Sequence, residues 1–173
     1  KHYGDDYPFY VTHSEILLKD NLSVQQKAYL ILLSSSLLRL ATRSGVNKLG
    51  HLFEKICGPV FKQLLPAKSD TYFFGSGSGE DSEFTGKLYD KVIKLCQKLH
   101  VPARSNFTLQ NIGIHNVGDG GLDWVGIFDF VDSQSSQPVF FGQCACGADW
   151  VDKEFDAHES KWQKYIQFEN GYL

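Results

Sequence analysis

Hydrophobic residues recur at helical spacing in the first part of the chain. Ser23 followed by Gln26 is a capping-box pattern, and it opens a predicted helix that runs to about Arg43. A second helix is predicted from about Asn47 to Leu65, where the Gly58–Pro59 pair is expected to kink or interrupt it. A third stripe of apolar residues predicts a helix from about Ser82 to Leu99.

The hydrophobic period changes after Pro102. Strands are predicted over Phe107–Val117, Leu122–Val131 and Val139–Cys146, and the polar, turn-rich stretch between the last two predicts a hairpin. A final helix is expected to begin near Asp152. The first 20 residues show no regular pattern and are expected to be irregular.

This order of elements predicts an α/β fold with a central mixed or antiparallel sheet flanked by helices. Residues 1–46 are expected to form an N-terminal helical segment that packs on a core of residues 47–173. Because the chain begins at Lys1 and contains no Met, we expect it to be a piece of a longer protein. The sequence leaves open that the core is truncated at its C-terminal end.

Composition narrows the class of protein. The chain has 173 residues, of which 42% are hydrophobic and 21% charged, which is typical of a globular domain. A net charge of -3 excludes a strongly cationic nucleic-acid coat but leaves a local basic groove open. No apolar run approaches the roughly 20 residues that span a bilayer, so no membrane partner is expected. Four scattered cysteines suggest reduced thiols and a cytoplasmic location.

Two polar residues stand in otherwise apolar predicted strands. Asp123 follows the Gly-rich bend GDGG, and Gln143 lies within VFFGQCACG. A carboxylate in such a strand is costly unless it is paired, protonated or bound to a metal. The predicted hairpin brings both residues to one end of the sheet, where their oxygens suit Mg²⁺ rather than zinc. A structural role, with Asp123 capping a turn and Gln143 at a sheet edge, is equally open.

Glu54 is the third candidate. The main apolar stripe of its helix is predicted to be the core face, and Glu54 lies off it, on a second flank with Cys57, Phe61 and Leu65. A carboxylate on a partly covered face is poorly solvated, as the acids of metal sites often are. The alternative is an ordinary surface glutamate paired with a lysine. The predicted core stripe consists of Leu49, Leu52, Phe53, Ile56, Val60 and Leu64.

The order of these motifs resembles the PD-(D/E)XK, or restriction-endonuclease-like, superfamily. The helix LGHLFEKICGPVFKQLLP precedes GDGGLD at the start of a strand, and FGQCA lies in the next strand. The pattern is similar to the Mrr-like branch, in which Gln replaces an acid, and to nuclease subunits of bacterial anti-phage systems. The resemblance covers about Leu49 to Phe168 and implies that Asp123, Gln143 and Glu54 hold the metal.

The sequence departs from this pattern at the motif lysine. The place two residues after Gln143 is Ala145, and a displaced position at Ala148 is also alanine. Such a lysine orients the attacking water and offsets charge on the phosphate. Three explanations are open: Lys153 or Lys161 reaches the site from the following helix, the domain is naturally inactive, or Ala148 replaces a natural lysine.

The resemblance implies a metal-dependent nuclease that hydrolyses DNA phosphodiester bonds with Mg²⁺ or Mn²⁺. Lys153 is the candidate for positioning water, and Lys48 and Lys161 are candidates for contacting the DNA backbone, each with solvated surface charge as the alternative. We expect the effector of an anti-phage system, working with a partner subunit or further domains. The alternative is a catalytically degenerate domain that binds nucleic acid or protein, and the missing lysine favours it.

Overall fold

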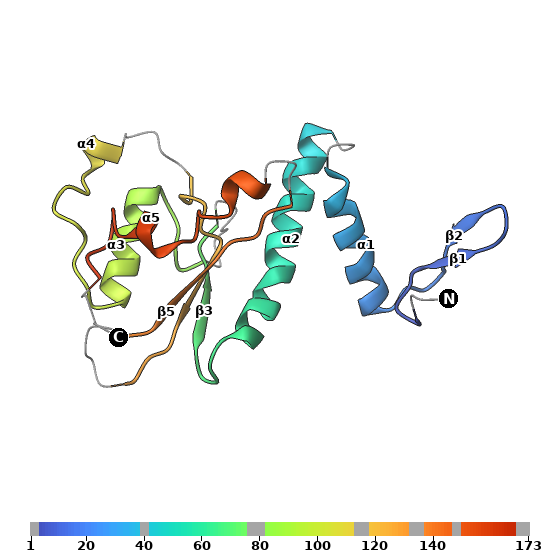
Figure 1. Ribbon diagram of the computed structural model, residues 1–173, viewed down its shortest axis with the longest axis horizontal. Coiled ribbons are helices and arrows are strands. Elements are labelled where there is room, and N and C mark those ends of the chain that lie inside the picture. The colour runs from blue at the N-terminus through green and yellow to red at the C-terminus, as the bar shows by residue number, and fades with distance from the viewer. Residues whose placement is uncertain are drawn as a thin grey trace. The chain divides into compact units, whose positions relative to one another are not determined.

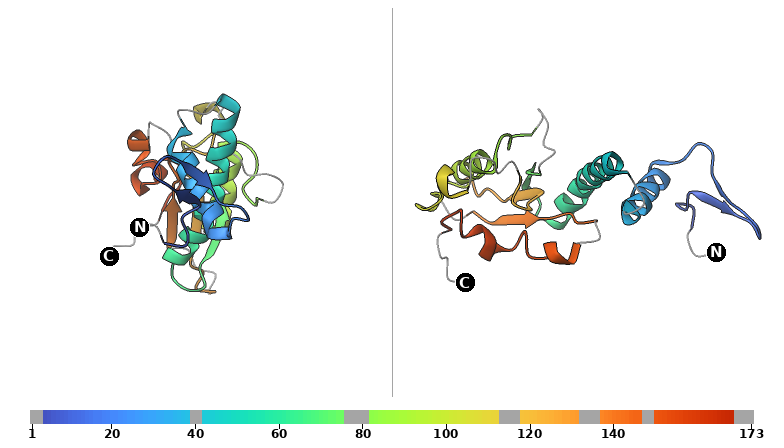
Figure 2. Two further views of the ribbon diagram at one scale, coloured as in Figure 1. Left: turned by 90° about the vertical axis from the view of Figure 1, so that its right-hand side faces the viewer. Right: turned by 90° about the horizontal axis from the view of Figure 1, so that it is seen from above.

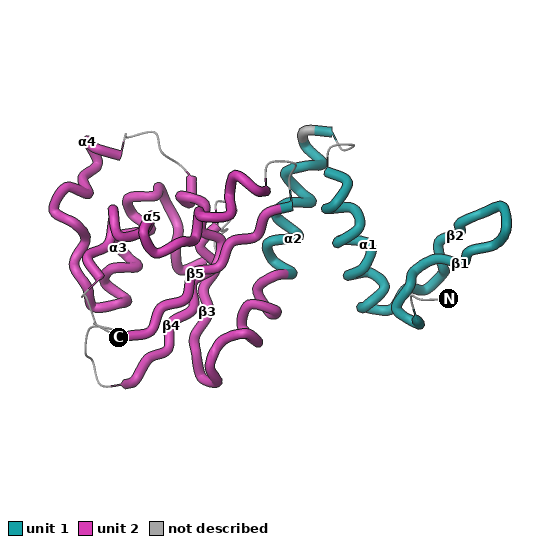
Figure 3. The backbone as a smooth tube through the Cα atoms, viewed as in Figure 1, with its two compact units in different colours: residues 1–56, 146–149 teal, residues 57–145, 150–173 magenta. Residues whose placement is uncertain are grey.

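A computed structural model describes residues 4–38, 42–75, 82–112, 118–131, 137–146 and 150–168. The described chain is a mixed α/β structure that contains two small antiparallel sheets. It divides into two compact units (Figure 3): unit 1 comprises Lys1–Ile56 and Cys146–Asp149, and unit 2 comprises Cys57–Ala145 and Trp150–Leu173.

Unit 1 begins with a short hairpin that the sequence did not predict. Strands β1 (Phe9–Val11) and β2 (Ile16–Leu18) pair antiparallel (Figure 2), so the expectation of an irregular N-terminus was wrong. The hydroxyl of Thr12 accepts a hydrogen bond from the backbone N–H of Glu15 at 3.0 Å, which closes the turn between the strands. Three-residue strands are too short to leave a clear alternating pattern.

Helix α1 (Val24–Ser36) starts as predicted. Ser23 is the N-cap, and its hydroxyl and the side chain of Gln26 form the reciprocal bonds of a capping box. The helix ends at Ser36, earlier than the predicted Arg43, and the backbone N–H of Leu37 donates to the carbonyl of Ser34.

Helix α2 (Arg43–Leu64) runs through Gly58 and Pro59 without interruption, contrary to expectation. Proline removes the hydrogen bond to the carbonyl four residues earlier, which is that of Lys55. Both Pro59 and Lys55 are exposed, so water can satisfy that carbonyl. The missing bond therefore falls on the solvent side of the helix.

The second sheet, in unit 2, has the strand order β3-β4-β5 and is antiparallel throughout. The hairpin of β4 (Trp124–Ile127) and β5 (Val139–Gly142) confirms the predicted pairing of these segments. Strand β3 (Asp70–Phe73) was not predicted. The predicted strand Phe107–Val117 was wrong where it is described, because α4 (Leu109–Ile112) is a short helical turn; residues 113–117 lie outside the described residues.

One face of this sheet is covered by the part of α2 that belongs to unit 2 (Figure 1). A side chain added at Gly58 would collide with the ring of Trp124, and one added at Gly142 would lie 2.9 Å from the ring of Phe61. Likewise, a side chain at Gly126 would collide with Leu65. The glycines allow α2 to approach the sheet closely, which explains why this flank packs inward.

The predicted core stripe of α2 was therefore wrong in this half of the helix. Val60 is 56% exposed and Leu64 is 79% exposed, whereas the flank of Phe61 and Leu65 meets the sheet. Hydrophobicity alone predicted that the flank with more leucine faces the core. The glycines of the sheet instead determine which flank of α2 can approach it closely.

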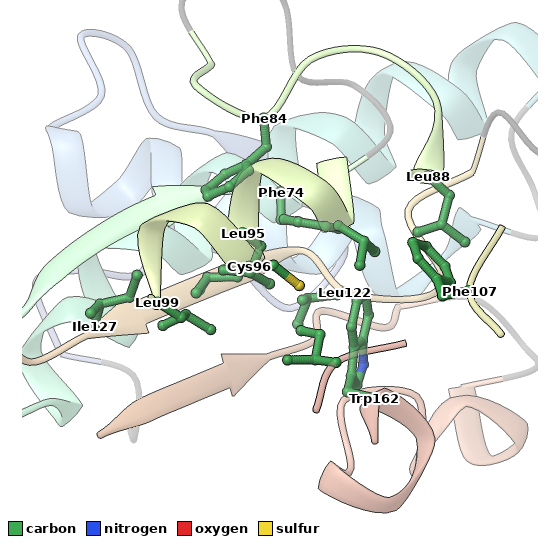
Figure 4. Packing of buried hydrophobic residues seen from close by; sticks show 13 residues of the cluster. Phe74, Phe84, Leu88, Leu95, Cys96, Leu99, Phe107, Leu122, Ile127 and Trp162 are labelled. Atoms are coloured by element: carbon green, nitrogen blue, oxygen red, sulfur yellow. The ribbon is translucent and has the colours of Figure 1, made fainter. Parts of the chain in front are cut away.

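The other face of the sheet is covered by α3 (Leu88–Lys98) and carries the main core (Figure 4). Helix α3 starts later than the predicted Ser82, because Gly86 adopts a positive φ of 101° and Lys87 is extended. The buried core contains thirteen residues: Phe74, Phe84, Leu88, Val92, Leu95, Cys96, Leu99, Phe107, Leu122, Val125, Ile127, Trp162 and Ile166.

The predicted C-terminal helix is two shorter elements. A 3-10 helix, η2 (Trp150–Lys153), precedes α5 (Glu159–Trp162), which His158 caps by accepting a hydrogen bond from the N–H of Ser160. The indole N–H of Trp162, the last residue of α5, donates at 2.9 Å to the carbonyl of Asp156, which lies between the two elements. This bond folds the segment back so that the buried Trp162 ring joins the core.

Candidate functional site

Asp123 lies at the end of the second sheet, one residue before β4. Its N–H donates to the carbonyl of Gly142 at 3.0 Å, and its carbonyl accepts hydrogen bonds from Phe74 at 2.7 Å and Gly75 at 3.1 Å. The residue is only 6% exposed. Its backbone is thus bound to both neighbouring segments of the sheet, which holds the carboxylate in a fixed place.

The structure brings Gln143 to Asp123. Trp124 pairs with Gly142 at the end of the β4–β5 register, and Asp123 and Gln143 are the residues that adjoin this last pair. The carboxylate Oδ2 of Asp123 accepts a hydrogen bond of 2.6 Å from the N–H of Cys144, the residue after Gln143. Half-buried Gln143 therefore lies beside the buried acid, as the hairpin predicted.

The glycine-rich bend before Asp123 is a tight turn. Asp119 Oδ1 accepts a hydrogen bond of 2.7 Å from the N–H of Gly121, and Gly120 and Gly121 have φ values of 68° and 83°. A side chain at Gly121 would lie 2.5 Å from the carboxyl group of Asp156. Glycine is required here both for backbone conformation and for space.

Lys91 of α3 is a buried charged residue that sequence reasoning missed. It is 2% exposed, and its ammonium donates to the carbonyl oxygens of Phe74 at 2.8 Å and Gly75 at 2.9 Å. These are the residues whose N–H groups bond to Asp123. The signal was available, because Lys91 is three residues after Leu88 and four before Leu95 and so interrupts the apolar stripe of the helix.

Glu54 is half-buried in α2 and lies 3.6 Å from the imidazole of His51. It shares a helical stripe with Gly58, Phe61 and Leu65, at intervals of four, three and four residues. Glu54 belongs to unit 1, whereas Asp123 and Gln143 belong to unit 2. Its participation in a common site stays a prediction.

The predicted basic residues have different surroundings. The ammonium of Lys161 forms an ion pair of 2.6 Å with Asp156, the residue that packs on Gly121. Lys153 is half-buried in η2, and Lys48 is exposed in the unit 1 part of α2. Ala145 is half-buried after β5, and Ala148 lies outside the described residues.

The oxygen donors at Asp123 fit a hard divalent cation. A buried carboxylate with a glutamine near it in the hairpin supplies the kind of oxygen donors that Mg²⁺ takes, usually one or two carboxylates with several waters. Within the described ranges, no three His, Cys, Asp or Glu side chains gather to hold a metal ion. A cation here would therefore depend on Asp123, with amide and carbonyl oxygens and water completing its shell.

Comparisons with protein-family models, curated proteins and solved structures give no match for this chain. In the part of the chain that the structure describes, no helix is both long and apolar enough to cross a membrane.

Proposed function

We propose that the chain is a metal-dependent nuclease domain that hydrolyses DNA phosphodiester bonds. The observation that carries this proposal is the buried carboxylate of Asp123 beside Gln143 at one end of the sheet. The N–H of Cys144 holds this carboxylate in one orientation, which makes it a preorganised oxygen donor for a divalent cation. The resemblance of the motif order to restriction-endonuclease-like proteins supports the same function.

The residues of the chain have distinct roles in this proposal. Asp123 and Gln143 would hold Mg²⁺ or Mn²⁺, and the N–H of Cys144 fixes the orientation of the Asp123 carboxylate. When bound, the cation polarises the phosphate and lowers the pKa of a bound water. Glu54 is proposed as a further ligand and Lys153 as the group that orients water. Lys48 and Lys161 are proposed to bind phosphates of the DNA backbone.

The proposal includes the cellular location, the biological role and the partners of the domain. We infer a cytoplasmic effector of bacterial anti-phage defence that works with a partner subunit or further domains. Its support is the resemblance of the motifs.

The second candidate is a catalytically degenerate domain that binds nucleic acid or protein. Alanine at position 145 favours it, since the motif lysine is missing there. The ion pair of Lys161 with Asp156 leaves less charge for a phosphate in either candidate, so it does not discriminate between them.

Plasmid cleavage in Mg²⁺ and in Mn²⁺ separates the candidates. The variants are the unaltered chain, Ala148→Lys and Asp123→Asn in each background. Asp123→Asn keeps the size of the side chain and its acceptor for Cys144, so it removes charge with little change of shape. Asp70→Asn is the matched control, because exposed Asp70 lies on β3 at the opposite end of the sheet.

The outcomes differ clearly. If the unaltered chain cleaves the plasmid, Asp123→Asn does not and Asp70→Asn does, the result supports a working site. The lysine of that site would then come from a position other than 145 or 148. Cleavage only after Ala148→Lys indicates an enzyme inactivated at that position. If no chain cleaves the plasmid but the unaltered chain still binds DNA, the result supports the binding module and contradicts the nuclease.

A further inference from the structure

Lys91 carries an ammonium inside the core of unit 2. Lys91 lies on α3 among the apolar residues that cover the sheet, and it is 2% exposed. An ammonium withdrawn from water is unstable unless protein dipoles replace its hydration. Two backbone carbonyl oxygens do so here, and the ammonium also lies 5.5 Å from the centre of the Phe74 ring.

An apolar side chain at this position would avoid the cost of burying charge. Methionine has a similar length and would fill the same space without an ammonium. The presence of lysine therefore points to a task that packing alone does not perform.

The hydrogen bonds around Phe74 and Gly75 identify that task. On one side, the N–H groups of both residues donate to the carbonyl of Asp123. On the other side, the carbonyl groups of both residues accept from Lys91. The two-residue segment is thus tied between the ammonium and the peptide that bears the candidate site's acid.

We propose that Lys91 is a positioning residue for Asp123. Its ammonium holds Phe74 and Gly75, the two residues that follow β3, in place. These residues in turn hold the backbone of Asp123 through their N–H groups, so that the carboxylate stays near Gln143. The effect of Lys91 on cation binding rests on the proposed function. Its effect on the mobility of the Asp123 segment is independent of the proposed function.

Four variants of the whole chain test this role. Lys91→Met removes the ammonium, Lys91→Gln keeps a neutral donor in case the Met variant does not fold, and Lys91→Arg keeps the charge. Lys94→Met is the matched control on the same helix, where exposed Lys94 bonds to Thr85 at 3.1 Å. The readouts are amide hydrogen exchange, resolved by peptide, and calorimetric titration with Mn²⁺ alone.

We expect Lys91→Met to accelerate exchange at residues 72–75 and 122–125 while the rest of α3 and β5 stays protected. Mn²⁺ affinity should fall about 10-fold or more, the usual effect of losing a residue that supports a metal ligand. Lys91→Arg should retain most of the protection from exchange and most of the Mn²⁺ affinity. Lys94→Met should change neither the exchange nor the affinity.

Other outcomes separate this proposal from the function it supports. Faster exchange confined to the Asp123 segment, in a chain that binds no Mn²⁺, would retain the positioning role and contradict the nuclease. Unchanged exchange at residues 72–75 and 122–125 would overturn the positioning role. Faster exchange throughout the core would also overturn it, because Lys91 would then act as a general stabilising residue.

Discussion

Asp123 and Lys91 are the charged residues among the buried side chains of the described chain. Charged residues are rarely buried without a specific partner or task. These two come from different parts of the chain and bond to the same two-residue segment, Phe74–Gly75: Asp123 accepts from its N–H groups through the backbone carbonyl, and Lys91 donates to its carbonyl groups. Their convergence at one end of the sheet makes this end the strongest candidate for a functional site.

Cys96 of α3 is a buried thiol whose pKa is raised by its burial. It is 4% exposed, and burial raises the pKa of its thiol from 9.0 to about 11. Between these values the unfolded chain binds fewer protons than the folded chain, so stability falls as pH rises through this window and is complete below it. We predict that the free energy of unfolding decreases by about 1 kcal/mol more in the unaltered chain than in Cys96→Ala from about pH 8 to about pH 10.

Urea unfolding of both chains at several pH values measures this difference. Groups that titrate in both proteins cancel in the comparison. Parallel pH dependence of the two chains would show that the thiol does not titrate as a buried group.

At the scale of elements, glycines decide how α2 meets the sheet. Gly58 faces Trp124, and an added side chain there would collide with the ring, whereas an added side chain at Gly50 meets nothing within 4 Å. We predict that Gly58→Ala destabilises the protein by about 1–3 kcal/mol through overpacking. Gly50→Ala, on the same helix, should stabilise it by about 0.5–1 kcal/mol through backbone entropy.

Urea unfolding followed by far-ultraviolet circular dichroism compares these two variants with the unaltered chain. Changes of the same sign and size would contradict the close approach of α2 at Gly58.

Local signals in the sequence predicted the elements that local interactions determine. The capping box of Ser23 and Gln26 marked the start of α1, and the turn-rich segment after β4 marked the hairpin. Strand β3 was not predicted because no short turn links it to its partner: it pairs with β4, far along the chain. The alternation after Phe107 was misleading, since the Phe107 ring stacks on Tyr89 at 5.3 Å and the chain then turns into α4.

The candidate site was predictable in part for the same reason. Asp123 and Gln143 share a hairpin, so their meeting followed from a short-range turn. Lys91 reaches Phe74 and Gly75 from a different element, so its partners depend on how α3 packs over the sheet. Periodicity could mark Lys91 as unusual but could not name its contacts.

At the scale of the whole chain, burial is concentrated in unit 2. All thirteen residues of the core cluster belong to it, whereas the apolar side chains of the β1–β2 hairpin in unit 1 are exposed, with Ile16 at 66% and Tyr10 at 59%. Segments with few buried contacts open with little free energy. We predict that amide hydrogen exchange is slowest in α3 and β4 and fast in β1 and β2.

Exchange followed by mass spectrometry checks this order. Protection of the hairpin as strong as that of α3 would contradict it and would indicate that the hairpin is covered by another surface.

The proposed function depends on a divalent-cation site formed by Asp123 and Gln143. A titration with Mn²⁺, followed by the electron paramagnetic resonance of the free ion, tests this most directly in the unaltered chain, Asp123→Asn and the control Asp70→Asn. We predict binding by the unaltered chain and by Asp70→Asn, and at least about 10-fold weaker binding by Asp123→Asn. Equal binding by all three chains, or none by the unaltered chain, would contradict the claim.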